Sequence, residues 1–217
     1  MDIYIHAYLM YNISMNVKMT SQPLERIRRI LKDQNGLLFT SDLSELGIPR
    51  TYLAVLERKG EIRRIARGVY SPATTLGDEM AALQGRNKVA VFSHETAAFL
   101  LDLTDRAPLF YSVTVPSGYN ATLLKKRNVK VYFVNRKVYP LGLITIKSSH
   151  GNDIQTFNLE RTICDLLRNR NQIDIQQINT ALKRYVKNKE KNIDLLFRYA
   201  KLFRVQKIIR EYIEVLL

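Results

Sequence analysis

The residues best suited to chemistry in this chain are cations and hydroxyl groups gathered toward the end of its first third. Arg50, Thr51 and Tyr52 are consecutive, and Arg58 and Lys59 follow about two helical turns later. Arginine can donate two parallel hydrogen bonds to O6 and N7 of guanine, and hydroxyl groups bind bases or phosphates. These residue types therefore predict contacts to nucleic acid rather than catalysis.

A second set of cations follows at residues 61–70. Arg63 and Arg64 are adjacent, so on a strand they lie on opposite faces, and we expect one of them to face solvent or DNA. Arg67 lies at the expected turn of a hairpin, where it could reach a minor groove or a phosphate. Ser41, at the start of an earlier helix, could add a phosphate contact through backbone amide groups.

The elements that must position these residues follow the order helix, strand, helix, turn, helix and hairpin, which is a winged helix-turn-helix. Apolar periodicity and turn residues predict them at 22–34, 37–39, 40–46, 47–49, 51–59 and 61–70. Thr40 is the expected N-cap of the second helix, and Asn35-Gly36 ends the first. The third helix would enter the major groove with its N-terminal residues, Arg50 to Tyr52, against the base edges.

Tyr52 has a second interpretation. Tyr52, Val55 and Leu56 would form an apolar stripe on one face of the same helix, which would place the tyrosine in the core. Glu57 could likewise neutralise Arg58 on the helix surface. Both interpretations of Tyr52 stay open at this stage.

The remainder of the chain predicts a mixed α/β domain that ends in helices. Helices are expected at 78–83, from Ser93, from Phe157 and from Ile175 to Leu217, and strands at 111–116, 129–134 and 142–146. The predicted class is α+β, with a winged helix-turn-helix at 19–72 and a C-terminal domain at 73–217. Residues 1–18 are expected to be an extension upstream of a start at Met19, or else an arm that packs on the body or on a second subunit.

The charge balance favours a nucleic-acid partner. The formal net charge is +14 and the pI is near 9.9, which is the electrostatic footprint of a nucleic-acid binder. Solvated surface could also account for it. Residues 19–72 carry only +4 of this charge and residues 73–217 carry +10. A protein that contacted DNA through the winged helix alone would not need so basic a C-terminal domain.

The single cysteine, Cys164, forms no internal disulfide, which favours a reducing compartment, the cytoplasm. Its apolar neighbours predict a core residue on a helix. The three histidines are scattered and have no metal-ligand spacing. Residues 3–17 are too short and too polar to span a membrane, and no membrane partner is expected.

Three short patterns that could suggest catalysis have simpler explanations. Residues 57–59 match the end of a nuclease motif but lack a suitable aspartate strand before them. Residues 93–95 could suggest hydrolysis, but neighbouring side chains on a helix point in different directions, and Ser93 suits an N-cap. Arg161 and Asp165 are four apart, so these two residues and Glu160 predict an internal ion pair or a cap network. We therefore expect no enzyme, no catalytic residue, no cofactor and no metal.

Several of these segments together resemble the AbiEi antitoxins. Those that resemble the winged helix of this family are Phe39–Leu53, Arg58–Ile62 and Ala66–Tyr70. Those that resemble its C-terminal domain are Ser93–Ala98, Val113–Pro116 and Leu159–Leu167.

The resemblance implies a type IV antitoxin of an abortive-infection system that defends against phage. Its winged helix would bind inverted repeats in its own promoter as double-stranded DNA and repress it. Its C-terminal domain would neutralise a cognate nucleotidyltransferase-like toxin without a stable complex. Inverted repeats would place two copies on DNA, which could be monomers in solution.

Two alternatives remain. The first is a winged-helix transcriptional regulator whose C-terminal domain senses a ligand or a partner and has no antitoxin role. The second is a nuclease or RNA-modifying enzyme, which rests only on the basic character of the C-terminal domain.

Overall fold

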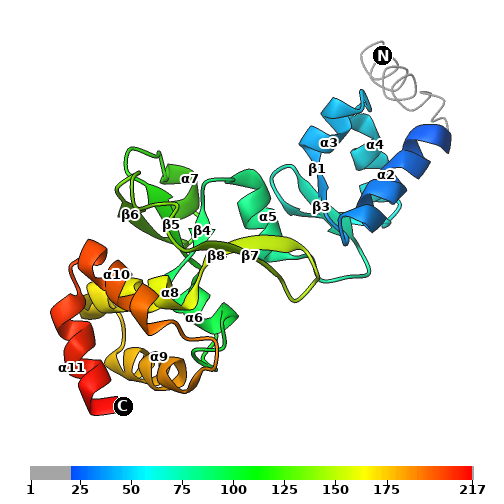
Figure 1. Cartoon of the computed structure of the whole chain (residues 1–217). Coiled ribbons are helices and arrows are strands. Elements are labelled where there is room, and N and C mark those ends of the chain that lie inside the picture. The colour runs from blue at the N-terminus through cyan, green and yellow to red at the C-terminus, as the bar shows by residue number, and fades with distance from the viewer. Residues whose placement is uncertain (1–20, 217) are drawn as a thin grey trace, which may run out of the picture. The chain divides into compact units, whose positions relative to one another are not determined.

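Figure 1 shows the protein as a computed structural model, which describes residues 21–216. The predicted extension at residues 1–18 and the candidate start at Met19 lie outside the described residues. The described chain divides into two compact units. One comprises residues 21–85 together with Ser148–Asn152, and the other comprises Arg86–Lys147 and residues 153–216.

The first unit is a winged helix-turn-helix. Its elements are α2 (Ser21–Asp33), β1 (Leu38–Phe39), α3 (Thr40–Glu45), α4 (Thr51–Arg58), β2 (Ile62–Ala66), β3 (Val69–Pro72) and α5 (Glu79–Arg86), which ends at the boundary. The three strands form an antiparallel sheet in the order β1-β3-β2. Together with the second unit described below, this confirms the predicted α+β class.

Local sequence signals account for most of these boundaries. Helix α2 places Ile27 in the core and its charged residues outside. It is followed by Asn35 and Gly36 at φ 44° and 82°, the left-handed backbone that the Asn-Gly pair predicts. Thr40, however, is not the N-cap of α3. Phe39 takes that position because its amide is satisfied by Asp42 Oδ2, 2.9 Å away.

The first unit continues past Pro72, where the sequence analysis had set the end of the winged helix-turn-helix. Gly77 lies so close to Ile65 that an added Cβ would stand 2.8 Å from its Cγ2. Gly85, on α5, lies against the ring of Phe39, and an added Cβ would stand 2.3 Å from Cζ. Glycine at these two positions therefore permits the segment after the wing to pack on it.

The second unit is a five-stranded mixed sheet with helices. Its elements are β4 (Val91–Phe92), α6 (His94–Leu100), β5 (Ser112–Pro116), α7 (Thr122–Lys125), β6 (Lys130–Val134), β7 (Leu143–Lys147), β8 (Asp153–Phe157), α8 (Leu159–Arg168), the 3-10 helix η1 (Arg170–Gln172), α9 (Ile175–Lys187), α10 (Ile193–Phe203) and α11 (Gln206–Leu216). The strand order is β6-β5-β4-β8-β7. Strands β5 and β6, and β4 and β8, are parallel, and the other two pairs are antiparallel.

Helix α8 lies at the centre of the second unit's core. Eight of its residues in a row, Glu160 to Leu167, are buried, and α6, α9, α10 and α11 pack against it (Figure 1). Cys164 is fully buried in this core, as predicted. No helix within residues 21–216 is both long enough and apolar enough to cross a membrane.

Candidate nucleic-acid interface

The N-terminal end of α4 presents Arg50 and Thr51 on the surface. Both side chains are exposed. Arg50 is the N-cap residue, and its Nη2 donates to Ser44 Oγ at 3.5 Å, while Ser44 Oγ donates to the carbonyl of Thr40 at 3.0 Å. The Ser44 hydroxyl on α3 thus holds the Arg50 guanidinium beside the turn between α3 and α4, and the guanidinium stays exposed. This leaves a cation available at the end of the helix expected to meet base edges.

Tyr52 is a core residue, the alternative that the sequence had left open. Its side chain is only 5% exposed and belongs to the apolar cluster that includes Leu43 and Leu56. Tyr52, Leu53 and Leu56 lie on the single apolar face of α4, whereas Thr51, Ala54 and Glu57 are exposed. We therefore remove Tyr52 from the set of residues expected to contact DNA.

The wing carries its three arginines at the surface. Arg63, Arg64 and Arg67 are all exposed, although only one of the adjacent pair was expected to be. Arg63 Nη2 donates to the carbonyl of Thr75 at 2.8 Å, and Arg64 Nε donates to the carbonyl of Ala66 at 3.3 Å. These bonds to backbone oxygens orient the guanidinium groups and leave their charges uncompensated.

A backbone contact brings the wing tip to the start of α3. The amide of Thr40 donates to the carbonyl of Gly68 at 2.9 Å. Gly68 has φ 75°, and an added Cβ would stand 2.9 Å from Thr40 Oγ1, so only glycine suits this approach. Arg67 and Ser41 are the chain neighbours of these two residues, and both are exposed. The tip of the wing and the start of α3 are therefore parts of one surface.

The remaining predicted cations lie at the opposite end of α4. Arg58 is its last residue and Lys59 its C-cap, and both are exposed. Eight residues of α-helix rise about 12 Å, so these two cations do not share a contact with Arg50. They suit a phosphate of the backbone better than the bases at the leading end.

The Ser93-His94 pattern forms a buried network in the second unit. Contrary to expectation, the two side chains meet, with His94 Nδ1 and Ser93 Oγ 2.9 Å apart. Ser93 takes the N-cap position of α6 but makes no capping bond with its side chain, because Thr114 Oγ1 also donates to its hydroxyl at 2.9 Å. His94 is 1% exposed and stacks on Tyr132 with ring centroids 3.4 Å apart.

The hydrogen bonds of this network oppose hydrolytic chemistry. Asn169 Nδ2 lies 2.9 Å from His94 Nε2, so a neutral imidazole accepts there and donates from Nδ1 to Ser93. Burial lowers the pKa of His94, and the nearby charges of Arg161 and Lys130 lower it further. A base must accept the proton of its serine, and this histidine donates to it instead.

The predicted ion pair of α8 is confirmed. Arg161 Nε lies 3.0 Å from each carboxylate oxygen of Asp165, and the two side chains are 0% and 2% exposed. Arg161 Nη1 also donates to the carbonyls of Val138 and Leu141 at 2.9 and 3.0 Å. Burial also raises the pKa of the Cys164 thiol, which opposes a role as a nucleophile.

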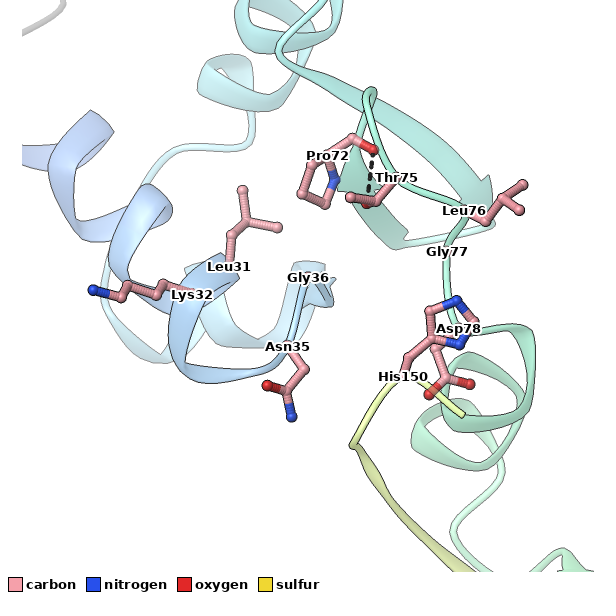
Figure 2. A pocket seen from close by; sticks show the side chains of 10 residues that line it. All are labelled: Leu31, Lys32, Asn35, Gly36, Pro72, Thr75, Leu76, Gly77, Asp78 and His150. Carbon is pink, nitrogen blue, oxygen red and sulfur yellow. Dashed lines mark hydrogen bonds between the residues drawn. The ribbon is translucent and has the colours of Figure 1, made fainter. Parts of the chain in front are cut away.

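A polar cluster around Asp78 in the first unit was not predicted from sequence patterns. This buried carboxylate accepts from Ala81 N at 2.9 Å, from Asn152 Nδ2 at 3.0 Å and from Ser148 Oγ. It borders a pocket of about 380 Å³ that also includes Leu31, Leu76 and His150 (Figure 2). Ser148 and Asn152 are 70 and 74 residues from Asp78 in the chain, a separation that no spacing rule could connect.

The fold and the exposed cations define a winged helix-turn-helix unit with a basic surface. Residues 25–73 match the family described as "Transcriptional regulator, AbiEi antitoxin". The predicted resemblance to AbiEi antitoxins is thereby confirmed for that segment, and it supports a role as a DNA-binding regulator.

The other comparisons are less specific. No curated protein matches the chain. A crystal structure of the RV2827C protein from Mycobacterium tuberculosis is similar, with a TM-score of 0.57 and 12% sequence identity over 85% of this chain and 72% of that chain. At this identity the likeness concerns the fold alone, and it extends over both units.

Proposed function

We propose that this protein is an antitoxin that represses the promoter of its own toxin–antitoxin operon and neutralises a cognate nucleotidyltransferase-like toxin. The family match at residues 25–73 supports it. The observation that supports it most strongly is that eight residues predicted to contact DNA are exposed on one winged helix-turn-helix. They are Ser41, Arg50, Thr51, Arg58, Lys59, Arg63, Arg64 and Arg67.

In this proposal the two parts of the chain have separate roles. Residues 19–72 bind inverted repeats in double-stranded DNA, with Arg50 and Thr51 at base edges and the wing arginines at phosphates or in a minor groove. Residues 73–217 act against the toxin, in the manner of a type IV antitoxin of abortive infection, with no stable toxin complex. The protein acts in the cytoplasm, has no catalytic activity, and is a monomer that pairs on its repeats.

Footprinting on the DNA upstream of the gene tests the first role. Wild-type protein is expected to protect two inverted half-sites, and the Arg50→Ala variant to protect neither at the same concentration. Arg198→Ala, which removes an exposed arginine of α10, is the matched control and should protect both. Absence of any protected site with wild-type protein would contradict the assignment.

A growth assay separates antitoxin from plain regulator. Co-expression of the full chain with the product of the adjacent gene is expected to restore growth, and the Arg50→Ala variant should still restore it when expressed from a foreign promoter. Failure of the wild type to rescue growth would favour the second candidate, a regulator that senses a ligand. The pocket beside Asp78 is the observation that favours that candidate (Figure 2).

A further inference from the structure

A second pocket, of about 510 Å³, lies wholly within the second unit. It is bordered by the segment after β6, the end of α8 with η1, and the junction between α10 and α11. Sites for small molecules commonly have volumes of roughly 300–1,000 Å³. The pocket is therefore large enough for a ligand of the size of a nucleotide.

Three arginines border this pocket, and no acidic residue is among those that line it in the described chain. Arg168 is the last residue of α8, Arg170 begins η1, and Arg204 is the C-cap of α10 with φ 59°. All three side chains are exposed. Guanidinium groups gathered around one hollow repel one another, and an anion bound among them relieves this repulsion.

Neighbouring groups hold two of these cations, Arg168 and Arg170, in place without neutralising them. The guanidinium carbon of Arg168 lies 5.9 Å from the ring centroid of Phe203, and Arg170 Nη1 donates to the carbonyl of Leu167 at 3.3 Å. Asp165, a carboxylate close in sequence, is buried and paired with Arg161 at 3.0 Å. It is therefore not available as a counter-ion for the pocket.

We propose that this pocket binds the phosphate groups of a free nucleotide. Three guanidinium groups match the multiple charges of a di- or triphosphate, whereas each phosphodiester of a nucleic acid carries a single charge. The lining also includes Val138, Leu202 and Val205, which offer apolar surface to a sugar or a base. A concave site suits a small ligand better than it suits the outside of a duplex.

The competing explanation is local stability. Arg168 and Arg204 stand at the C-terminal ends of α8 and α10, where a cation stabilises the helix through its interaction with the helix dipole. In that case their removal would lower the melting temperature of the protein and would reveal no ligand. Binding measurements on folded variants separate the two explanations.

Isothermal titration of the full chain with ATP, pyrophosphate, adenosine and a twelve-nucleotide single strand without terminal phosphates tests the proposal. ATP and pyrophosphate should bind, adenosine should not, and Arg168→Ala/Arg204→Ala should weaken ATP binding by at least tenfold. If the double variant does not fold, the single variants Arg168→Ala and Arg204→Ala are used in its place. Arg198→Ala, outside the pocket, is the control and should bind ATP like the wild type. Each variant is used only if its circular dichroism and melting curve remain cooperative.

Three outcomes would overturn the proposal. They are no heat from ATP or pyrophosphate at millimolar concentration, equal ATP affinity in all folded pocket variants and the wild type, or binding of the single strand alone. The last would assign the arginines to a nucleic-acid backbone. None of these outcomes bears on promoter binding through the winged helix, so this inference and the proposed function fail independently.

Discussion

Arginine has opposite environments on the winged helix-turn-helix and in the core of the second unit. In the winged helix-turn-helix, Arg50, Arg63 and Arg67 are exposed. Arg50 donates to a hydroxyl group and Arg63 to a backbone oxygen. In the second unit, Arg161 is fully buried and paired with Asp165. Exposed, uncompensated cations are free to exchange water and counter-ions for a polyanion, whereas a buried paired cation can only support the fold.

The surroundings of Arg161 show what burial of a charge requires. Its guanidinium carbon lies 4.3 Å from the ring centroid of Phe157 and 4.1 Å from that of Phe203. The carboxylate of Asp165 accepts from its Nε, and two backbone carbonyls accept from its Nη1. Removing only one member of such a pair lowers stability strongly, because the other member is left as a buried, unpaired charge.

The largest effect is therefore expected from Arg161→Met. It should lower the free energy of unfolding by about 3–5 kcal/mol, measured by urea denaturation, because it isolates Asp165. Arg67→Met, a matched change at an exposed site, should stay within about 0.5 kcal/mol of the wild type. If the two variants were equally stable, the contrast between buried and exposed arginines would be wrong.

The next effect concerns the carboxylate of Asp78. Asp78→Ala removes the acceptor for Ala81, Ser148 and Asn152 and should cost about 1–3 kcal/mol of unfolding free energy. Asp153→Ala is the control, since the Asp153–Lys147 pair is 66% exposed on both sides and should contribute little. Equal melting temperatures for the two variants would mean that the Asp78 contacts do not stabilise the first unit.

The third effect is a pH dependence carried by His94. Its pKa is lowered in the folded protein, chiefly by burial, so below pH 6.5 the unfolded chain binds a proton that the folded one does not. Stability should consequently fall as the pH decreases from 6.5 toward the lowered pKa, by at most about 1.4 kcal/mol per pH unit.

A matched pair of variants isolates this contribution. His94→Asn should flatten the stability profile between pH 6.5 and 5 relative to the wild type, whereas His150→Asn, at an exposed histidine, should leave the slope unchanged. An unchanged slope in His94→Asn would show that another group causes it.

The sequence predicted local features well because short-range patterns determine them. The Asn35-Gly36 helix end, the turn at Gly68 and the pair Arg161–Asp165 each depend on residues within four positions of one another. Elements β4, α7 and β8 were not predicted. Strand β4 has only two residues, and β8 contains the polar residues Asp153, Gln155 and Thr156 among its few apolar ones.

For the candidate sites too, local features could be predicted from the sequence, whereas features that depend on distant residues could not. Exposure of Arg50 and Arg67 follows from helix and turn periodicity, whereas the burial of Tyr52 had to be observed, because an amphipathic tyrosine suits either environment. The pocket of Arg168, Arg170 and Arg204 joins two helix ends far apart in the chain. The net charge of +10 in residues 73–217 indicated that this part of the chain has a basic surface, but it did not indicate where on the fold that surface lies.

The most direct test of the central claim is the salt dependence of promoter binding. Fluorescence anisotropy on a fragment from upstream of the gene would give the slope of log K against log salt for the wild type, for Arg63→Ala/Arg67→Ala and for the control Arg198→Ala. Each lost phosphate contact should reduce the slope by about 0.9, so the double variant should lose up to about 1.8 with no change in stability. A double variant with the slope and affinity of the wild type would contradict the assignment of the wing to DNA.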